Sequence, residues 1–238
     1  YITKSLDVLE KRFEETIPNI FSPTNRFYID FKNVQGNLES EKTFFYPNKY
    51  IFDSLRISKI RMLEFINNED ITVFMTIGRY DYQKGHDRLI GAFEKNYENN
   101  NNIALIMICP HGSLKKETLA RVRNSQAKNN IIVLGRMSNP YSLLKNIDAF
   151  ILSSHYEGLG LVVYEALALD TDVITVNLTE TVELLQNDEA LIVDNSEEGI
   201  EQGIHDYLYS GHNRNVFDFE TPKKQSKIEF ESIFNTKN

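Results

Sequence analysis

From residue 71 onward, short apolar runs alternate with stretches of helical periodicity, and this alternation constrains the fold more than any other feature. The helical pattern is clear in the first interval, where Leu89, Ile90, Phe93 and Tyr97 recur on one face. Strands alternating with helices predict a parallel sheet with helices on both faces. The expected fold class is therefore α/β, a Rossmann-like doubly wound parallel sheet. The six strand-like runs are residues 71–77, 103–108, 131–134, 149–152, 173–176 and 191–193.

A cationic loop follows the first of these strands, reading Gly-Arg-Tyr-Asp-Tyr-Gln-Lys-Gly over residues 78–85. In an open parallel sheet, such loops lie at the carboxyl ends of the strands, where ligands bind. Arg79 can grip a phosphate with two donors, and Lys84 can act as a compact point charge. A surface charge is the alternative for each. The position of the loop favours phosphate binding for both residues, and more strongly for Arg79 than for Lys84.

Two carboxylates, Glu157 and Glu165, bracket a glycine-rich helix start after the fourth strand. Gly158 and Gly160 allow backbone to approach a ligand closely, although turn glycines are common in any α/β protein. The unpaired N–H groups of the first helical turn form an anion site. Ionised carboxylates accept hydrogen bonds only, so they suit the hydroxyl groups of a sugar or ribose. The segment predicts a site for both phosphate and polyol.

These motifs, taken in order, resemble the donor half of retaining GT-B glycosyltransferases of the GT4 type. The resemblance covers roughly residues 71 to 209 and is fairly specific as an ordered set. It places the chain in the C-terminal half of a GT-B architecture. The motifs that carry it are Gly78-Arg79 with Lys84-Gly85, then Leu134-Gly135, and then Glu157 and Glu165 with seven residues between them.

The resemblance also implies a role for each residue. Arg79 and Lys84 would hold the donor diphosphate and Glu157 would contact the transferred sugar, forming the catalytic set, while Glu165 would bind the ribose hydroxyls. It implies retention of anomeric configuration with no metal or other cofactor, and we slightly prefer a UDP-sugar. Backbone near Arg136 and Met137 would read the base. Further donor-binding residues are Gly78, Gly158, Leu159, Gly160 and Leu161.

The chain divides into three parts in this interpretation. Residues 1–70 are expected to be the end of a preceding acceptor-side domain plus a linker, because an amphipathic helical stretch is followed by prolines without clean periodicity. Residues 71–210 form the nucleotide-sugar-binding Rossmann-like domain. Residues 211–238 form a C-terminal tail and helix, with Thr221-Pro222 as the helix start. The length of 238 residues is too short for two full Rossmann-like domains.

Three functions compete. The first is a hexosyltransferase that moves a sugar from a nucleotide-diphosphate-sugar to a glycan, lipid or protein acceptor, with help from an N-terminal domain or partner chain. The second is a non-catalytic nucleotide-sugar-binding or pairing subunit of a split glycosyltransferase. The third is another GT-B enzyme, such as an epimerase or phosphorylase. The spacing of the two glutamates favours a transferase.

Charge and cysteine content exclude some partners and compartments. With 26 basic and 34 acidic residues, a net charge of −8 disfavours nucleic acid. A single cysteine, Cys109, excludes an internal disulfide and fits a reducing cytosol, and its place at the end of a strand predicts a buried, inert thiol. No apolar stretch reaches the roughly 20 residues of a membrane helix. We expect a cytoplasmic protein, with peripheral membrane contact left open.

Overall fold

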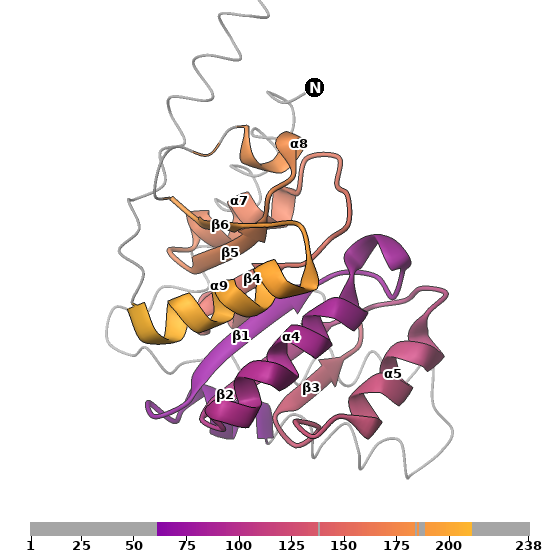
Figure 1. Ribbon diagram of the computed structural model, residues 1–238, viewed down its shortest axis with the longest axis vertical. Coiled ribbons are helices and arrows are strands. Elements are labelled where there is room, and N and C mark those ends of the chain that lie inside the picture. Colours follow the sequence, from indigo (N-terminus) through magenta and orange to yellow (C-terminus); the bar gives the residue numbers. More distant parts are fainter. Residues whose placement is uncertain (1–60, 138, 184, 186–188, 211–238) are drawn as a thin grey trace, which may run out of the picture.

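A six-stranded parallel sheet forms the centre of the molecule, in the order β3-β2-β1-β4-β5-β6 (Figure 1). The computed structural model describes residues 61–137, 139–183, 185 and 189–210. The α/β, Rossmann-like doubly wound class is confirmed, because this order is that of the dinucleotide-binding Rossmann fold. The strands are β1 (Thr72–Ile77), β2 (Ile103–Ile108), β3 (Ile131–Leu134), β4 (Ala149–Leu152), β5 (Asp172–Val176) and β6 (Leu191–Val193).

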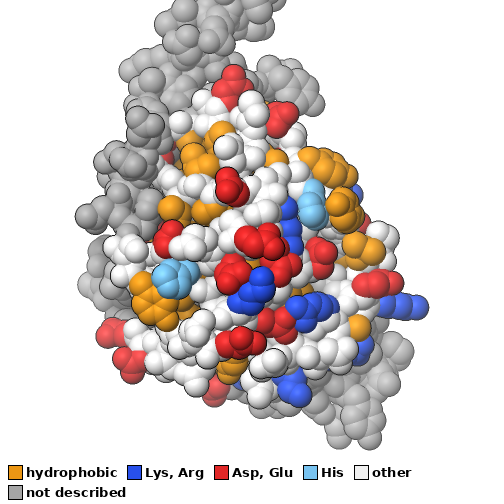
Figure 2. Space-filling view, in the orientation of Figure 1, with side chains coloured by type: hydrophobic (Ala, Val, Ile, Leu, Met, Phe, Trp, Pro, Cys, Tyr) orange, Lys and Arg blue, Asp and Glu red, His pale blue; other side chains and the backbone are white. Residues whose placement is uncertain are grey.

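Helices pack against this sheet, and three of them, α4, α5 and α9, lie side by side over one face (Figure 1). Of the remaining helices, α7 contacts β4 and β5, and α6 contacts α7. Acidic and basic side chains intermingle on the face that carries α4 and α9 (Figure 2). Lys95 of α4 forms a salt bridge with Glu201 of α9. The bounds are η1 (Tyr82–Lys84), α4 (His86–Asn99), α5 (Lys115–Asn124), α6 (Tyr141–Leu144), α7 (Leu161–Ala168), α8 (Thr179–Val182) and α9 (Glu197–Ser210).

The core follows from the apolar runs. All residues of β2 and β4 are buried, as expected for strands covered on both faces of a parallel sheet. Residues 61–66 are helical, and Met62 is buried in the same core, upstream of residue 71.

The predictions for residues 1–60 and for the tail and helix of 211–238 lie outside the described residues. No helix within the described part is long and apolar enough to cross a membrane.

The position of the site is set by the strands on either side of β1. The whole length of β1 pairs with β2, from Thr72↔Ile103 to Ile77↔Ile108. On the other side only Phe74↔Ala149 and Met75↔Phe150 pair with β4. The chain order reverses between β1 and β4, and ligands of open α/β sheets bind beside the carboxyl ends of strands at such a switch point. The loops after β1 and β4 flank this point.

Candidate active site

Gly85 allows the β1 and β4 loops to approach each other. Its φ is +58°, and a Cβ added there would lie 2.2 Å from the carbonyl oxygen of Ser153. A side chain would therefore be both strained and blocked by backbone. The approach is reinforced by the His155 amide, which donates to the carbonyl of Gln83 at 2.8 Å, and by the Ser153 hydroxyl, which donates to the carbonyl of Lys84 at 3.0 Å.

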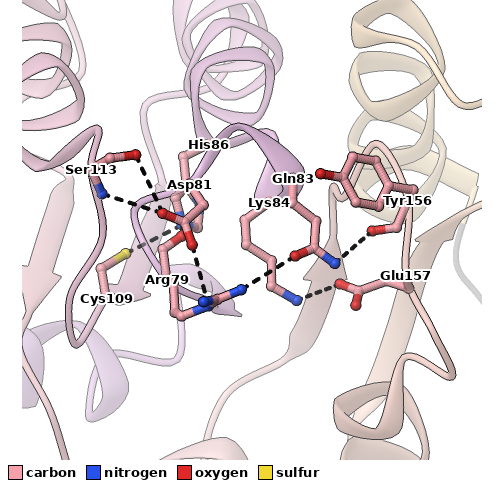
Figure 3. Close-up of polar contacts among 9 residues, drawn as sticks. All are labelled: Arg79, Asp81, Gln83, Lys84, His86, Cys109, Ser113, Tyr156 and Glu157. Carbon is pink, nitrogen blue, oxygen red and sulfur yellow. Dashed lines mark hydrogen bonds and ion pairs between the residues drawn. The ribbon is translucent and has the colours of Figure 1, made fainter.

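Lys84 and Glu157 form an ion pair between these loops, with 2.5 Å between Nζ and Oε1 (Figure 3). Their side chains are 18% and 9% exposed. The same carboxylate oxygen accepts a hydrogen bond of 2.5 Å from the Ser154 hydroxyl. The structure thus brings together two residues that the sequence assigned to one site although they are 73 positions apart. An anionic ligand would compete with Glu157 for Lys84.

Arg79 lies nearby in a more open position, with 51% of its side chain exposed. Its Nε is 3.3 Å from Oδ2 of Asp81, and its Nη2 donates to Oε1 of Gln83 at 3.5 Å (Figure 3). The Gln83 amide donates in turn to the carbonyl of Tyr156 at 3.1 Å. The guanidinium is therefore held beside the junction of the two loops, on the same loop as Lys84. The sequence did not indicate that Asp81 and Gln83 orient it.

The second glutamate, Glu165, lies on α7 and is 9% exposed. The hydroxyl of Tyr141 on α6 donates to its Oε1 at 3.1 Å. A buried carboxylate needs such hydrogen bonds, because burying a charge without partners is costly. Sequence reasoning did not identify this contact, since nothing in the pattern relates Tyr141 to α7.

The glycines before α7 serve different purposes. Gly160 has a φ of +56°, and an added Cβ would lie 2.6 Å from Oγ1 of Thr181, so this backbone requires glycine. Gly158 is exposed, and an added Cβ would meet nothing within 4 Å. Leu159 is half-buried and Leu161 is 36% exposed. Helix α7 has no side-chain cap, and although the Val163 amide donates to the carbonyl of Gly160, the N–H groups of Leu161 and Val162 lie at the helix end that attracts anions.

The predicted base-reading residues follow β3, two strands away from β1. Arg136 is exposed, and Met137 packs against the edge of the core. None of the hydrogen bonds or ion pairs among the described residues joins either to Lys84 or Glu157. The base-reading role stays a prediction.

Beneath the loops, His86 and Cys109 are buried neighbours. Nε2 of His86 lies 3.0 Å from the carbonyl oxygen of Arg79 and 3.6 Å from Sγ of Cys109. Burial lowers the pKa of His86 and raises that of the Cys109 thiol to about 12. The prediction that Cys109 is buried is confirmed, and its inertness stays a prediction. Among the residues described, no group of three or more His, Cys, Asp or Glu side chains is placed to hold a metal ion.

Sequence reasoning also missed Arg88 and Asn195, which lie behind the β4 loop. Arg88 is only 7% exposed although it is charged. It donates to the carbonyls of Ser153 and Ser154 and to the side chain of Asn195. A charged residue among the apolar positions of a helix carries no signal for such contacts, because its partners are more than 60 residues away in the chain.

The strand order and the meeting of a cationic loop with a glutamate loop at the switch point define a Rossmann-like domain of the ligand-binding type. The family is then identified by comparison. The family model "Glycosyl transferases group 1" matches residues 60–224, and the chain belongs to this family.

Similar proteins agree with this assignment. The "Uncharacterized glycosyltransferase MJ1059" of Methanocaldococcus jannaschii is 35% identical over 149 residues, covering 60% of this chain and 36% of that protein. A Campylobacter jejuni enzyme is 28% identical over 208 residues, covering 80% of this chain and 56% of its own length. It is named N-acetylgalactosamine-N,N'-diacetylbacillosaminyl-diphospho-undecaprenol 4-alpha-N-acetylgalactosaminyltransferase. The chain thus spans between about a third and just over half of these curated relatives.

Solved structures share the fold. A glycosyltransferase from Rickettsia africae superposes with a TM-score of 0.58 at 17% identity, covering 81% of this chain and 53% of that one. A trehalose-6-phosphate synthase gives a TM-score of 0.56 at 14% identity, covering 71% of this chain and 43% of that one. These likenesses concern the arrangement of the backbone.

Proposed function

We propose that this chain is the donor-binding part of a glycosyltransferase that transfers a hexose from a nucleotide-diphosphate-sugar to an acceptor. In this proposal it is the C-terminal half of a GT-B enzyme of the GT4 type, acting with retention of configuration and without a metal. The carrying observation is the Lys84–Glu157 pair, which joins the cationic loop to the glutamate loop at the switch point of the sheet. Membership of the family supports the same activity.

The diphosphate is the part of the donor that the cationic loop fits. Cleaving the sugar–phosphate bond builds negative charge on the departing diphosphate, and donors already fixed in place stabilise that charge. Lys84, Arg79 and the uncapped N-terminus of α7 supply such donors. The diphosphate would replace Glu157 as the ion-pair partner of Lys84. These groups supply positive charge from the protein alone, which is the reason for proposing a metal-independent reaction.

The two glutamates fit the hydroxyl groups at either end of the donor. Glu157, once released from Lys84, would accept hydrogen bonds from the transferred sugar, while Ser154 keeps its carboxylate oriented. Glu165 would accept from the ribose hydroxyls, with its orientation set by Tyr141. Backbone near Arg136 and Met137 would read the base, for which we retain the slight preference for uracil.

For the acceptor, we propose a glycan or a lipid-linked glycan. The name of the Campylobacter relative specifies transfer to a diphospho-undecaprenol-linked sugar, and two Staphylococcus aureus relatives are named for capsular polysaccharide biosynthesis. An N-terminal domain or a partner chain would bind this acceptor. The proposed location is the cytoplasm, with peripheral contact to the membrane.

Calorimetric titration of this chain with UDP, GDP, ADP and CDP in the absence of metal tests the donor site. One nucleotide is expected to bind saturably, and Arg79→Ala and Glu165→Ala are each expected to weaken it about tenfold or more, as the loss of a charge-assisted hydrogen bond implies. Lys95→Ala is the matched control, because it removes an exposed cation that bridges to Glu201 over α9. Lack of binding by the unaltered chain at millimolar nucleotide would refute the proposed donor site.

A further inference from the structure

Arg88, in the first turn of α4, is a buried cation whose hydrogen bonds all go to oxygen atoms of two distant loops. Nε donates to the carbonyl of Ser153 at 2.8 Å, and Nη2 donates to the carbonyl of Ser154 at 2.6 Å. The other acceptors belong to Asn195, in the loop between β6 and α9. Its side-chain oxygen accepts a hydrogen bond from Nη2 at 2.7 Å, and its backbone carbonyl accepts one from Nη1 at 3.3 Å. The planar fork of the guanidinium serves both loops at once.

Asn195 completes the arrangement from the other side. Its side-chain amide donates to the carbonyl of His155 at 3.2 Å. The carbonyls of three consecutive residues, Ser153, Ser154 and His155, are therefore each held by a fixed side-chain donor. We call Arg88 and Asn195 together the carbonyl clamp.

Each of the three residues held by the carbonyl clamp also contacts the candidate active site. The hydroxyl of Ser153 donates to the carbonyl of Lys84, and the hydroxyl of Ser154 donates to the carboxylate of Glu157. The amide of His155 donates to the carbonyl of Gln83, whose side chain contacts Arg79. The orientation of these three residues thus determines where Glu157 lies relative to Lys84.

The geometry points to the carbonyl clamp as a positioning device: Arg88 and Asn195 fix the β4 loop so that Glu157 is presented to the donor and to Lys84. This inference rests on the proposed function, because it assigns the clamp a role in binding the nucleotide-diphosphate-sugar. Among the described residues, neither forms a hydrogen bond or ion pair with the side chain of Lys84 or Glu157, so both are positioning residues. A lysine at position 88 would keep the charge but lacks the fork needed to reach both carbonyls at once.

The test uses two clamp variants, Arg88→Lys and Asn195→Ala, and one control. Asn96→Ala is the matched control, because Asn96 is a buried residue of the same helix that donates to the carbonyls of Ala92 and Glu201, away from the β4 loop. Hydrogen exchange of backbone amides in residues 153–160 measures the order of the loop. Calorimetry with the nucleoside diphosphate that binds the unaltered chain, and with its nucleotide-sugar, measures the effect on the site.

Both clamp variants are expected to speed exchange in residues 153–160 about tenfold and to weaken nucleotide-sugar binding about tenfold, the fold-change for losing a charge-assisted hydrogen bond. The control should lower stability without changing either readout. Wild-type exchange in both clamp variants would overturn the inference. Full retention of affinity despite a disordered loop would also overturn it, as would wild-type exchange and affinity in Arg88→Lys.

The failure of the proposed function would look different. If the unaltered chain binds none of the four nucleotides, the donor-site proposal fails, whereas faster loop exchange in the clamp variants would still support the clamp as the device that orders this loop. If Arg88→Lys does not fold, Asn195→Ala decides, because Asn195 is exposed and its own backbone carbonyl contact to Arg88 is kept.

Discussion

The ion pair between Lys84 and Glu157 gives the most direct test of the site in solution. The perturbation is a double-mutant cycle of Lys84→Met and Glu157→Gln. Lys84→Met removes the ammonium while keeping a long side chain. Glu157, which is 9% exposed, then keeps the hydrogen bond from the Ser154 hydroxyl but loses its cation. Glu157→Gln removes the negative charge and keeps the shape.

The magnitude follows from the contact length and the burial. A hydrogen bond between charged groups contributes about 1.5–3 kcal/mol to stability, and the 2.5 Å separation and low exposure of both side chains place this pair within that range. Stranding the carboxylate adds a desolvation cost, so Lys84→Met alone should cost about 2–4 kcal/mol, between exposed and fully buried pairs. The coupling energy of the cycle should be about 1.5–3 kcal/mol.

Urea unfolding of the four proteins, followed by circular dichroism, measures this coupling. The Lys95–Glu201 pair is the comparison cycle, since its atoms approach to 2.9 Å but its side chains are 44% and 36% exposed, and its coupling should not rise above the error of the measurement. Equal coupling in the two cycles would refute the argument that the switch point holds a preformed, partly desolvated pair. Lys84→Met should also weaken nucleoside diphosphate binding in the calorimetric assay.

Three further predictions concern single residues. Gly160→Ala should destabilise the fold by at least about 1–2 kcal/mol in urea unfolding because its backbone is left-handed, whereas Gly158→Ala should change stability by less than about 0.5 kcal/mol; similar losses in both would contradict this. Burial lowers the pKa of His86 below its ordinary 6.5, so the unfolded chain binds more protons and stability should fall as the pH drops below 6.5. His86→Gln should flatten that slope in unfolding curves between pH 5 and 7.5, and an unchanged slope would exclude His86 as its source. Tyr141→Phe should weaken binding of the nucleotide about fivefold by removing one hydrogen bond that orients Glu165, measured by calorimetry, and full affinity in this variant would show that the hydroxyl does not orient the carboxylate.

Much of the architecture could be predicted from the sequence because it depends on local patterns. The runs 103–108, 131–134, 149–152 and 191–193 are strands with those bounds, because short apolar runs that alternate with helical stretches are typical of the strands of a parallel sheet. The loops that carry Lys84 and Glu157 were placed together from the rule that ligands bind at the ends of parallel strands. Their direct ion pair is the detail that the rule does not supply.

The missed residues share a physical cause. Arg88, Asn195 and Tyr141 act through hydrogen bonds to residues 24 to 107 positions away, and such bonds depend on side-chain directions in the finished fold. Neither hydrophobic periodicity nor motif spacing records them. The helical residues 61–66 were not recognised as part of the packed core for a related reason, because Met62 contributes through its tertiary contacts.

The narrow pairing between β1 and β4 has a consequence for how the protein folds. Strands β1 to β3 and strands β4 to β6 are each contiguous in the chain and pair mainly with their sequence neighbours, whereas only two residue pairs connect the two halves across β1 and β4. Lys84 and Arg88 come from the first half, and Glu157 and Asn195 come from the second. Local pairings form faster than distant ones, so each half can acquire its strands and helices before the halves dock. The site would then be completed in the last step, and nucleotide binding during refolding would report docking of the halves, later than the signal from secondary structure.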